Sequence, residues 1–525
     1  MSTLSEWRPR YNPWLIAVTV SIATFMEVLD TSIANVALPH IAGGLSAGVE
    51  ESTWVLTSYL VANAVVLPLS GWLADRIGQK RFYMICVAVF TISSFLCGLA
   101  PSLPALIFFR VLQGAGGGGL APSEQSILAE TFEPKKRGMA FAFYGMVIVL
   151  APAIGPTVGG FITDTFSWRW IFFINIPFGI ASLLLSSRIV EESPAKVEAR
   201  KKADKVPIDI AGLLLVAVGL GLLQVVLDKG QIEDWFDSRF ILTFSIGAAI
   251  CLLLFCFREW NHTSPILKIS LLKNRTFAVT CLLNMGLYAV LLGSTVLIPQ
   301  YLQLLLHYTA ERAGMALSVG GLVGLLVMPI VGKLVAKIDA RALIVFGLSL
   351  MGMALVMMTR FYLGIDFQHA MLYRVYQAIG IAFLFVPIQT LSYTGSTWKD
   401  SNQISAISNL ARNLGGSLGI SAATTIIARR SQVHQRFLSA YAEAGREAYT
   451  HSVSALQGIL QASGFSSSDA MRQSVARIYR TLQIQAQALS YVDAFQIFAA
   501  ICFLMIPLTL LARKNVPGQR GASAH

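Results

Sequence analysis

The chain has 525 residues, of which 55% are hydrophobic and only 13% are charged. Its apolar residues gather in runs of about 20, the length at which an α-helix crosses a hydrocarbon layer about 30 Å thick. This composition excludes a soluble protein. The net charge of +12 indicates contact with an acidic lipid surface rather than with nucleic acid.

Fourteen apolar runs predict fourteen transmembrane helices, an even number that places both chain ends on the same side. The runs begin near Trp14, Glu51, Phe82, Leu103, Met139, Trp170, Ile208, Phe240, Thr276, Arg312, Ala342, His369, Gln403 and Val492. The sequence therefore predicts an all-α integral membrane protein.

Two carboxylates, Glu27 and Asp30, lie inside the first apolar run. An ionised acid in hydrocarbon costs several kcal/mol, so it is rarely present without a function. The i, i+3 spacing places both side chains on one helical face, where they can line one cavity. We expect at least one of them to be functional, and the alternative is a buried acid neutralised by an arginine.

A glycine-rich loop follows the second run and carries Gly71, Asp75, Arg76, Gly78 and Arg81. The glycines allow a tight turn and close helix approach. The aspartate can accept hydrogen bonds from the N-terminus of a neighbouring helix, where the dipole favours an anion. Such a contact can form in one conformation and break in another, which predicts a cytoplasmic gate; the alternative is a basic loop that only sets topology.

The fourth run carries Arg110, Gln113 and Glu124. Asp30 and Arg110 lie about 9 and about 6 residues from the outer ends of their helices, so at ~1.5 Å per residue their depths differ by only ~5 Å. The two side chains can therefore pair. Glu124 lies nearly four turns further toward the cytoplasm, and it is a further proton site, a selector of cationic substrates or a structural interfacial acid.

The fifth run contains a cluster of helix-bending and small residues: Gly145, Gly155, Pro156, Gly159 and Gly160. Proline removes a hydrogen bond from a helix, and glycines permit close helix packing. This cluster predicts a bending or sealing element, with a purely structural kink as the alternative.

The second part of the chain repeats the first at nearly one offset. Pro68 and Gly71 recur 261 residues later as Pro329 and Gly332, and Arg110 and Gln113 recur 264 residues later as Arg374 and Gln377. Two matches at nearly the same offset predict two six-helix halves, the architecture of secondary transporters.

This repeat predicts the following division: a cytoplasmic N-terminus 1–12, a first half 13–190, a basic linker 191–207, two extra helices 208–258, a cytoplasmic loop 259–275, a second half 276–512 and a tail 513–525. The second half includes a polar outer arm, 429–490, with an amphipathic stripe that begins at Met471. The arm packs on itself as a hairpin or docks on a partner protein.

The second half lacks the acid of the first, because its first helix has only Asn284 and Tyr288 where an acid would be needed. Proton coupling is therefore expected in the first half alone. Arg412 either binds an anionic substrate or pairs with an acid across the cavity. The candidate cavity residues are Asn35, Gln113, Asn284, Tyr288, Gln377, Gln389, Asn409 and Arg412.

Basic residues set the orientation. Most of the 40 Lys and Arg residues fall on the side of the chain ends, while the short loops of the other side hold only Arg169, Lys229, Arg239, Arg312 and Arg360. The positive-inside rule therefore places both ends in the cytoplasm. All six cysteines lie in apolar runs, which argues against structural disulfides and metal sites.

Five of these motifs together resemble a known family. Residues 29–39, the loop at 71–81, the segment 110–114, the element 155–160 and the segment 168–177 are similar to signature motifs of the major facilitator superfamily. With fourteen helices the chain resembles the EmrB/QacA-type drug:proton antiporters, and its outer arm resembles the EmrB branch. The resemblance implies that Asp30 and Arg110 belong to the proton-coupling machinery. It also implies a periplasmic adaptor and an outer-membrane channel as partners.

The sequence thus predicts an inner-membrane antiporter that uses the proton gradient to export amphipathic toxic compounds. A proton-coupled exporter of one metabolite, such as a siderophore, fatty acid or peptide product, has the same residues; uptake symport and a non-transporting scaffold are further alternatives. No enzymatic activity, metal or other cofactor is expected, and no Walker-type loop indicates the use of ATP.

Overall fold

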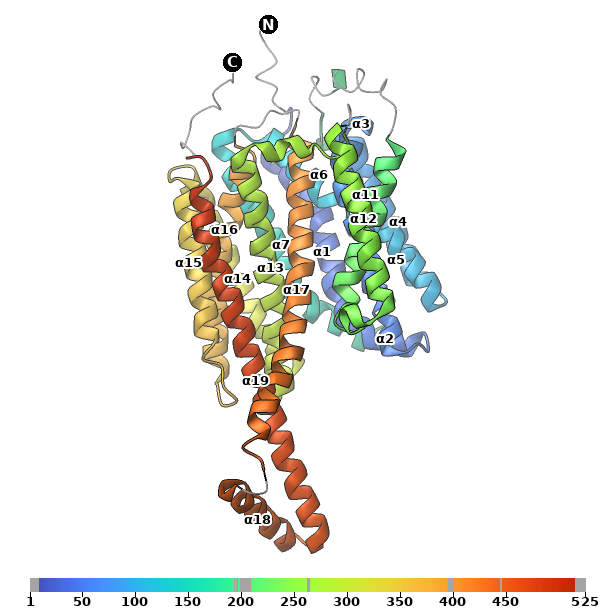
Figure 1. Cartoon of the computed structure of the whole chain (residues 1–525). Coiled ribbons are helices and arrows are strands. Elements are labelled where there is room, and N and C mark those ends of the chain that lie inside the picture. The colour runs from blue at the N-terminus through green and yellow to red at the C-terminus, as the bar shows by residue number, and fades with distance from the viewer. Residues whose placement is uncertain are drawn as a thin grey trace.

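The structure is a computed structural model that describes residues 9–192, 194, 197–198, 209–261, 265–394, 400–443 and 446–514. Throughout this part of the chain the regular structure is helical, and the helices run side by side as one bundle (Figure 1). The all-α membrane fold predicted from the apolar runs is therefore confirmed. Most of the predicted basic linker and the last residues of the tail lie outside the described residues.

The helices follow the predicted order. The first half contains α1 (Pro13–Gly44), α2 (Val49–Ser52), α3 (Trp54–Ile77), α4 (Gln79–Leu99), α5 (Leu103–Gly117), α6 (Leu120–Thr131), α7 (Pro134–Thr165), α8 (Trp170–Phe173) and α9 (Asn175–Ile189). The middle segment contains α11 (Ile210–Lys229), η1 (Trp235–Asp237), α12 (Arg239–Asn261) and η2 (Ile269–Lys273). The second half contains α13 (Arg275–Gln300), η3 (Tyr301–Leu305), α14 (Ala310–Val335), α15 (Ala340–Met358), α16 (Phe367–Ser392), α17 (Ser401–Ser439), α18 (Glu447–Ala462) and α19 (Ser467–Leu510).

Twelve helical segments among the described residues are long and apolar enough to cross a membrane. The two other predicted spans are helical but do not meet this criterion of length and apolar composition, for different reasons. The fourth span consists of two short helices, α5 and α6, joined at Gly118 and Gly119, and the thirteenth, α17, carries many polar residues. Both follow the direction of the bundle in Figure 1, so the prediction of fourteen spans is compatible with the structure although the test finds twelve.

The core consists of two sets of helices that meet along α7 and α14. Buried apolar side chains of α13, α15, α16 and α19 form one cluster, and those of α1, α4, α6 and α7 form another that also includes residues of α14 and α16. Close approach is possible where glycines meet: a Cβ on Gly138 would lie 3.1 Å from the backbone oxygen of Gly332. The exact domain boundaries stay a prediction.

The extra helix α11 contacts both halves. Asp228 accepts a hydrogen bond from Thr57 of α3, and Lys229 Nζ donates to Thr53 Oγ1 over 2.6 Å. On its other side, Ser417 of α17 donates to Gln224 over 3.0 Å. These contacts make α11 a bridge between α3 and α17.

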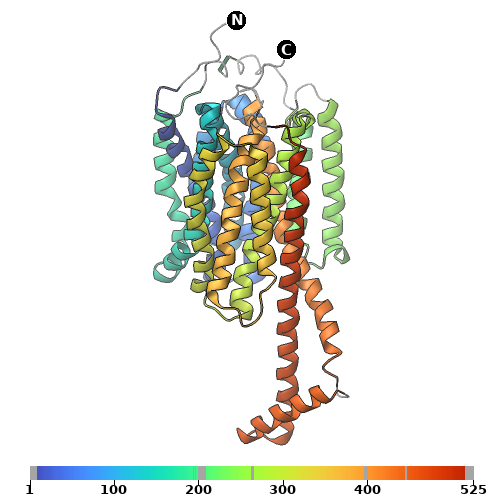
Figure 2. The same cartoon turned by 90° about the vertical axis from the view of Figure 1, so that its left-hand side faces the viewer.

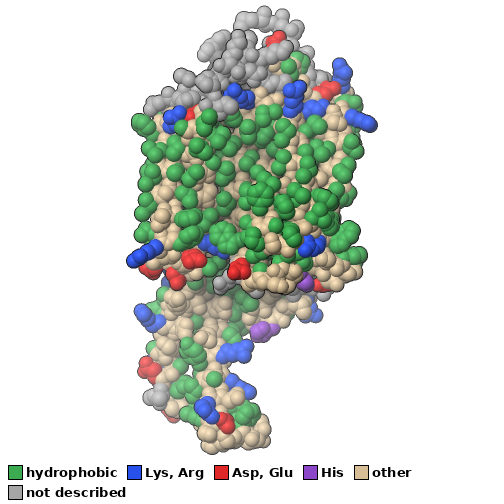
Figure 3. Space-filling model, turned by 90° about the vertical axis from the view of Figure 1, so that its right-hand side faces the viewer, with side chains coloured by type: hydrophobic (Ala, Val, Ile, Leu, Met, Phe, Trp, Pro, Cys, Tyr) green, Lys and Arg blue, Asp and Glu red, His purple; other side chains and the backbone are tan. Residues whose placement is uncertain are grey.

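Helix α1 begins and α19 ends at the same end of the bundle, called here the terminal end; the arm projects from the opposite end, the arm end (Figures 1 and 2). Figure 3 shows a broad apolar belt on the bundle, with Lys and Arg side chains near its two edges. This distribution fits a bundle embedded in a bilayer with its arm in water.

The arm is a helical hairpin made by the end of α17, by α18 and by the first part of α19. The turn before α19 has the expected form, since Gly464 adopts a positive φ of 93° and Ser466 caps the helix. The hairpin buries Ala470 and Ser474 of α19, whereas Met471 and Val475 of the predicted stripe are exposed. Self-packing therefore covers a face next to the predicted stripe and leaves much of the stripe in solvent.

Candidate functional site

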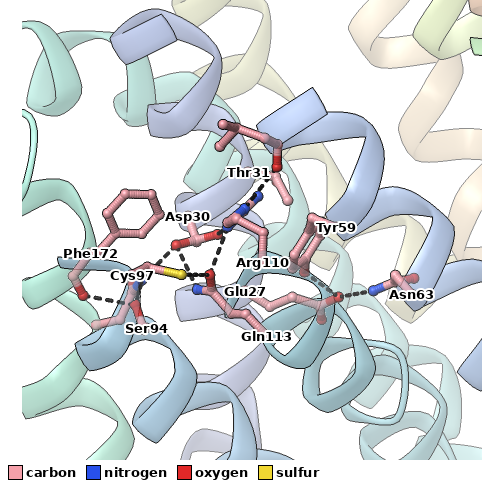
Figure 4. Close-up of polar contacts among 12 residues, drawn as sticks. Glu27, Asp30, Thr31, Tyr59, Asn63, Ser94, Cys97, Arg110, Gln113 and Phe172 are labelled. Carbon is pink, nitrogen blue, oxygen red and sulfur yellow. Dashed lines mark hydrogen bonds and ion pairs between the residues drawn. The ribbon is translucent and has the colours of Figure 1, made fainter. Parts of the chain in front are cut away.

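An ion pair between Asp30 of α1 and Arg110 of α5 lies in the interior of the first half (Figure 4). Arg110 Nη1 donates to Asp30 Oδ2 over 2.6 Å, and the two side chains are 0% and 1% exposed. The sequence-based estimate that these residues lie at matching depths is consistent with this contact. A buried pair of this kind resists separation, because removing one partner leaves an uncompensated charge and costs about 3–5 kcal/mol.

Two amides complete the surroundings of the Asp30 carboxylate. Gln113 Nε2 and Asn175 Nδ2 donate to Asp30 Oδ1 over 2.9 and 2.7 Å. Gln113 also accepts from Arg110 over 2.8 Å, so aspartate, arginine and glutamine form a closed ring of hydrogen bonds. Asn175, at the start of α9, is fixed further by its contact with Ser94 of α4. The carboxylate is thus held by three donor side chains from two helices, Arg110 and Gln113 of α5 and Asn175 of α9.

Arg110 connects this network to helix α3. Its Nε donates to the backbone oxygen of Val55 over 3.0 Å, and its guanidinium lies 4.3 Å from the centre of the Tyr59 ring. Its Nη2 is buried without a hydrogen-bond partner among the described residues. Arg110 therefore holds α1 and α3 together, and one of its donors is available for another arrangement.

Glu27 lies near the pair but belongs to a different set of contacts. Asn63 Nδ2 donates to Glu27 Oε1 over 3.1 Å, and the Tyr59 hydroxyl lies 3.5 Å from the same oxygen. Figure 4 shows the Glu27 carboxylate directed toward Asn63 and away from Asp30. The Glu27 side chain is half-buried, whereas Asp30 is buried. The two acids, adjacent in sequence, therefore occupy separate environments.

Glu124 of α6 is fully buried against α1. Its Oε1 accepts a hydrogen bond from Ser21, and its Oε2 has no hydrogen-bond partner in the described part of the chain. Thr24, one turn after Ser21 on α1, also has a buried hydroxyl without a partner there. Ser21, Thr24 and Glu27 follow one face of α1, so polar groups continue from Glu27 to Glu124.

The second half repeats this geometry without the acid. Arg374 Nη1 donates to Gln377 Oε1 over 2.6 Å, and Gln377 Nε2 donates to Ser294 over 2.7 Å. Gln113 and Asp30 are 83 residues apart, and so are Gln377 and Ser294. The position equivalent to Asp30 is therefore Ser294; the sequence-based choice of Asn284 and Tyr288 as its counterparts was wrong, because it did not apply the repeat offset of 264 to Asp30 itself.

Arg412 lies between the two halves. Its Nη1 donates to the Tyr288 hydroxyl over 3.3 Å, and its Nη2 donates to Asn409. The guanidinium lies 5.9 Å from the centre of the Tyr144 ring, which belongs to the first half. Among the described residues Arg412 forms no ion pair with a carboxylate, and its Nε is buried without a partner. Of the two predicted alternatives, pairing with an acid across the cavity is not found in this conformation.

The other predicted cavity residues lie in two regions. Asn409 also contacts the amide of Gln125 over 3.0 Å, and Gln389 donates to Asn284 over 3.4 Å. These residues are buried in the centre of the bundle. Asn35, by contrast, is exposed on the arm-side part of α1, where it donates to the backbone of its own helix.

The predicted gate loop lies at the terminal end against the start of α17. Asn402 Nδ2 donates to Asp75 Oδ1 over 2.7 Å, and a Cβ on Gly71 would lie 3.0 Å from the Asn402 backbone oxygen. Gly78 adopts a positive φ of 105°, which explains a glycine at this turn. Arg76 lies over the ring of Trp72, and Arg81 is exposed. The aspartate thus meets a helix N-terminus of the other half, as the sequence suggested, and it accepts there from the Asn402 side chain.

The predicted element of the fifth span lies within α7. Its members are Gly145, Gly155, Pro156, Gly159 and Gly160. A Cβ on Gly155 would lie 2.3 Å from Ser32 Oγ, and one on Gly159 would lie 2.9 Å from Ile33, so these glycines allow α7 to approach α1. Gly145 instead lies against Met328 of α14 and Phe385 of α16, while Gly160 has open space around it. The glycines of this element therefore contact three helices, α1, α14 and α16.

Sequence reasoning missed four residues of this site: Asn175, Ser94, Tyr59 and Asn63. Asn175 belongs to the segment 168–177, whose motif was recognised without a role for this side chain. Tyr59 and Asn63 are one turn apart on α3, and a polar face within an apolar helix was the available signal. Ser94 carried no signal of its own.

The described residues contain no group of three or more His, Cys, Asp or Glu residues that could hold a metal ion. The site instead offers a buried acid paired with an arginine, two further acids without a basic partner among those residues, and two buried arginines without an acid. Such groups can bind and release protons or small ions, and they form no nucleophile and base pair for covalent chemistry.

Comparisons with known proteins agree with this architecture. The family model of the Major Facilitator Superfamily matches residues 20–420. The chain is 40% identical over 431 residues to the multidrug export protein EmrB of Haemophilus influenzae, and the aligned part covers 81% of this chain and 82% of that protein. It is 37% identical over 441 residues to EmrB of Escherichia coli K12, covering 83% and 85%. It is also 35% identical over 514 residues to the fatty acid resistance protein FarB of Neisseria gonorrhoeae, covering 97% of each.

Solved structures show the same fold at low sequence identity. A double-tryptophan mutant of XylE has a TM-score of 0.63 at 14% identity, with 97% of each chain covered. The human organic anion transporter MFSD10 has a TM-score of 0.59 at 14% identity, with 95% of this chain and 100% of that chain covered. The chain is a multi-span membrane transporter rather than an enzyme, and it belongs to the major facilitator superfamily, in the branch of the EmrB-type export proteins.

Proposed function

We propose that this chain is a proton-driven antiporter that exports amphipathic toxic compounds from the cytoplasm across the bacterial inner membrane. The observation that carries the proposal is the fully buried Asp30–Arg110 pair in the first half, with Ser294 at the equivalent place in the second. The relatives named as multidrug export proteins support the substrate class. The proton gradient would drive the cycle through Asp30, with no other cofactor.

The route from Asp30 to the gate follows helix α3. A proton on Asp30 removes the charge that attracts Arg110. Arg110 also donates a hydrogen bond to the backbone oxygen of Val55, near the start of α3. Asp75, at the other end of α3, bonds to Asn402 of α17. About 20 residues of rigid helix, ~30 Å at ~1.5 Å per residue, separate these two contacts. Loss of the ion pair would free α3 to move and thereby release the gate.

The conformation fits one stage of such a cycle. At the terminal end α17 is bonded to the first half by Asp75–Asn402 and by Ser126–Asn402. Toward the arm end, α1 and α13 make no broad contact within the described part of the chain, and Asn35 is exposed. With both chain ends in the cytoplasm, as the basic residues predict, this is the outward-facing state, in which protons reach the site from outside.

Efflux from proteoliposomes tests the proposal. With an imposed proton gradient and a fluorescent amphipathic dye, Asp30→Asn should reduce gradient-driven dye movement to the level of empty liposomes. The control is Asp366→Asn, which changes an exposed acid at a helix cap where asparagine serves equally well. Gradient-dependent movement that is unchanged in the Asp30 variant would refute the assignment.

The arm suggests partners outside the inner membrane. We propose that the exposed stripe of α19, including Met471 and Val475, docks on a periplasmic adaptor that leads to an outer-membrane channel. The hairpin leaves these side chains in solvent, and a stable helical arm with an open apolar face fits a partner surface. Charged substitutions there should abolish resistance in cells while dye movement in proteoliposomes continues.

A second candidate function is export of one amphipathic metabolite such as a fatty acid. Two observations favour it: Arg412 is buried without a carboxylate partner among the described residues, and the relative FarB is named a fatty acid resistance protein. Competition between dodecanoate and dodecyltrimethylammonium, which share a tail and differ in charge, separates the two candidates. Selective competition by dodecanoate would favour the metabolite exporter.

A further inference from the structure

The surroundings of Arg374 in α16 differ from those of its counterpart in the first half by one functional group. In the first half, Arg110 and Gln113 both bond to the Asp30 carboxylate. In the second half, Gln377 bonds instead to the neutral hydroxyl of Ser294, and Arg374 Nη2 reaches only Thr295 Oγ1 over 3.3 Å.

The charge on Arg374 has no compensation from a carboxylate of the described residues. Arg374 is 8% exposed, its Nε is buried without a hydrogen-bond partner among these residues, and the acceptors of its Nη1 and Nη2 are the neutral oxygens of Gln377 and Thr295. A guanidinium keeps its charge in proteins, so it cannot be neutralised by losing a proton. An isolated charge in a buried site is strongly unfavourable unless it is paired.

The repeat also indicates where the missing charge belongs. Serine carries a hydroxyl where aspartate carries a carboxylate, and Ser294 takes the place of Asp30 next to an arginine and a glutamine in the same relative positions. Thr295, beside Ser294, is half-buried, so the surroundings of the guanidinium are not fully closed. The donors that converge there are the N–H groups of Arg374 and Gln377, because the Ser294 and Thr295 hydroxyls accept from them and donate to the backbone oxygen of Leu291 over 3.1 and 2.7 Å. A guanidinium beside an amide is the chemistry that holds an anion.

We propose that the site formed by Ser294, Thr295, Arg374 and Gln377 binds a small monovalent anion, chloride or a carboxylate of the size of formate, in the place that the Asp30 carboxylate occupies in the first half. The bound anion neutralises Arg374 and stabilises the second half. This site is separate from the proton site and does not depend on the export activity proposed above.

The test is the melting temperature of the purified full-length chain, followed by tryptophan fluorescence at constant pH and ionic strength. Replacing gluconate by chloride should raise the melting temperature saturably by about 2 °C or more, because an anion that binds only the folded state stabilises it by mass action. Arg374→Gln should lose this dependence. Ser294→Asp should also lose it and should melt at the higher temperature already in gluconate, since it supplies a tethered carboxylate.

Two controls separate charge from shape and from the other buried arginine. Ser294→Asn has the size of the aspartate without its charge, and it should remain at the lower melting temperature in gluconate. Arg412→Gln should keep the chloride dependence. Formate separates the sources: stabilisation by both ions supports a general site for small anions, and stabilisation by chloride alone supports a halide site.

Equal melting temperatures of the wild-type chain in gluconate, chloride and formate would overturn the proposal, as would an undiminished chloride effect in Ser294→Asp. Should Arg374→Gln fail to fold, the comparison of Ser294→Asp with Ser294→Asn still decides. Dye movement is not a readout of this test, so a failure of the export proposal leaves it unaffected.

Discussion

Asn175 is the residue whose replacement gives the most informative prediction, because it contacts Asp30 without being part of the ion pair. Asn175→Leu keeps the approximate size of the side chain and removes the 2.7 Å hydrogen bond to Asp30 Oδ1 and the 2.9 Å bond to Ser94. The Arg110 and Gln113 contacts to the carboxylate remain. The variant therefore weakens the hold on the charged aspartate by one donor.

The size of the effect follows from the energy of that bond. A hydrogen bond to a charged group contributes about 1.5–3 kcal/mol, and a change of about 1.4 kcal/mol in the balance between two protonation states corresponds to one pH unit. The remaining donors can partly take over, so we expect the lower end of this range. With one donor fewer, the protonated form of Asp30 is favoured, so the proton leaves toward the cytoplasm only at a lower proton concentration. The pH at which export is half-maximal should therefore rise by about one unit.

The assay is gradient-driven dye movement in proteoliposomes over a series of internal pH values. Asn63→Leu is the matched control: it removes a similar amide that donates to Glu27, and it should leave the pH midpoint in place. A midpoint unchanged in a folded Asn175→Leu variant, or one moved to lower pH, would refute the role assigned to this amide.

Three further predictions concern packing, the gate and the arm. In Gly114→Ala the new Cβ would lie 2.3 Å from the Tyr59 backbone oxygen, so the melting temperature should fall by the equivalent of about 1–3 kcal/mol, whereas Gly160→Ala, with open space around it, should not be destabilised. Asn402→Ala removes the bond to Asp75 and should raise the labelling of a cysteine introduced at Asn409 from the terminal side; unchanged labelling would argue against a gate. Met471→Glu together with Val475→Glu should leave dye movement in proteoliposomes intact and abolish resistance in cells, and full resistance would exclude docking at the stripe.

The sequence was sufficient to predict the ion pair, because span ends fix depth and two residues at matching depth in neighbouring helices can meet. It was also sufficient to predict that Asp75 of the gate loop meets the N-terminus of a neighbouring helix, because the helix dipole favours an anion there. Both predictions depended on properties of a single helix that its own sequence determines: its length, the residues that share a face, and the positions of its ends.

Contacts between distant helices could not be predicted in the same way. Asn175 is 145 residues from Asp30, and no periodicity within α9 indicates which side chain reaches across to α1. The equivalence of Ser294 and Asp30 was available from the repeat, but a serine gives no signal of its own in an apolar helix. The face of α19 that the hairpin buries could not be predicted from the apolar stripe for another reason: the buried residues at the start of α19 are the small Ala470 and Ser474, which carry no strong hydrophobic signal.

If Asp30 carries the exchanged proton, substrate binding must displace that proton. The measurement is to add an amphipathic substrate to the purified chain in weakly buffered detergent solution and to count the protons released. We expect release from the wild-type chain and from Glu27→Gln, and none from Asp30→Asn in a variant that still binds the substrate. Undiminished proton release from substrate-bound Asp30→Asn would contradict it.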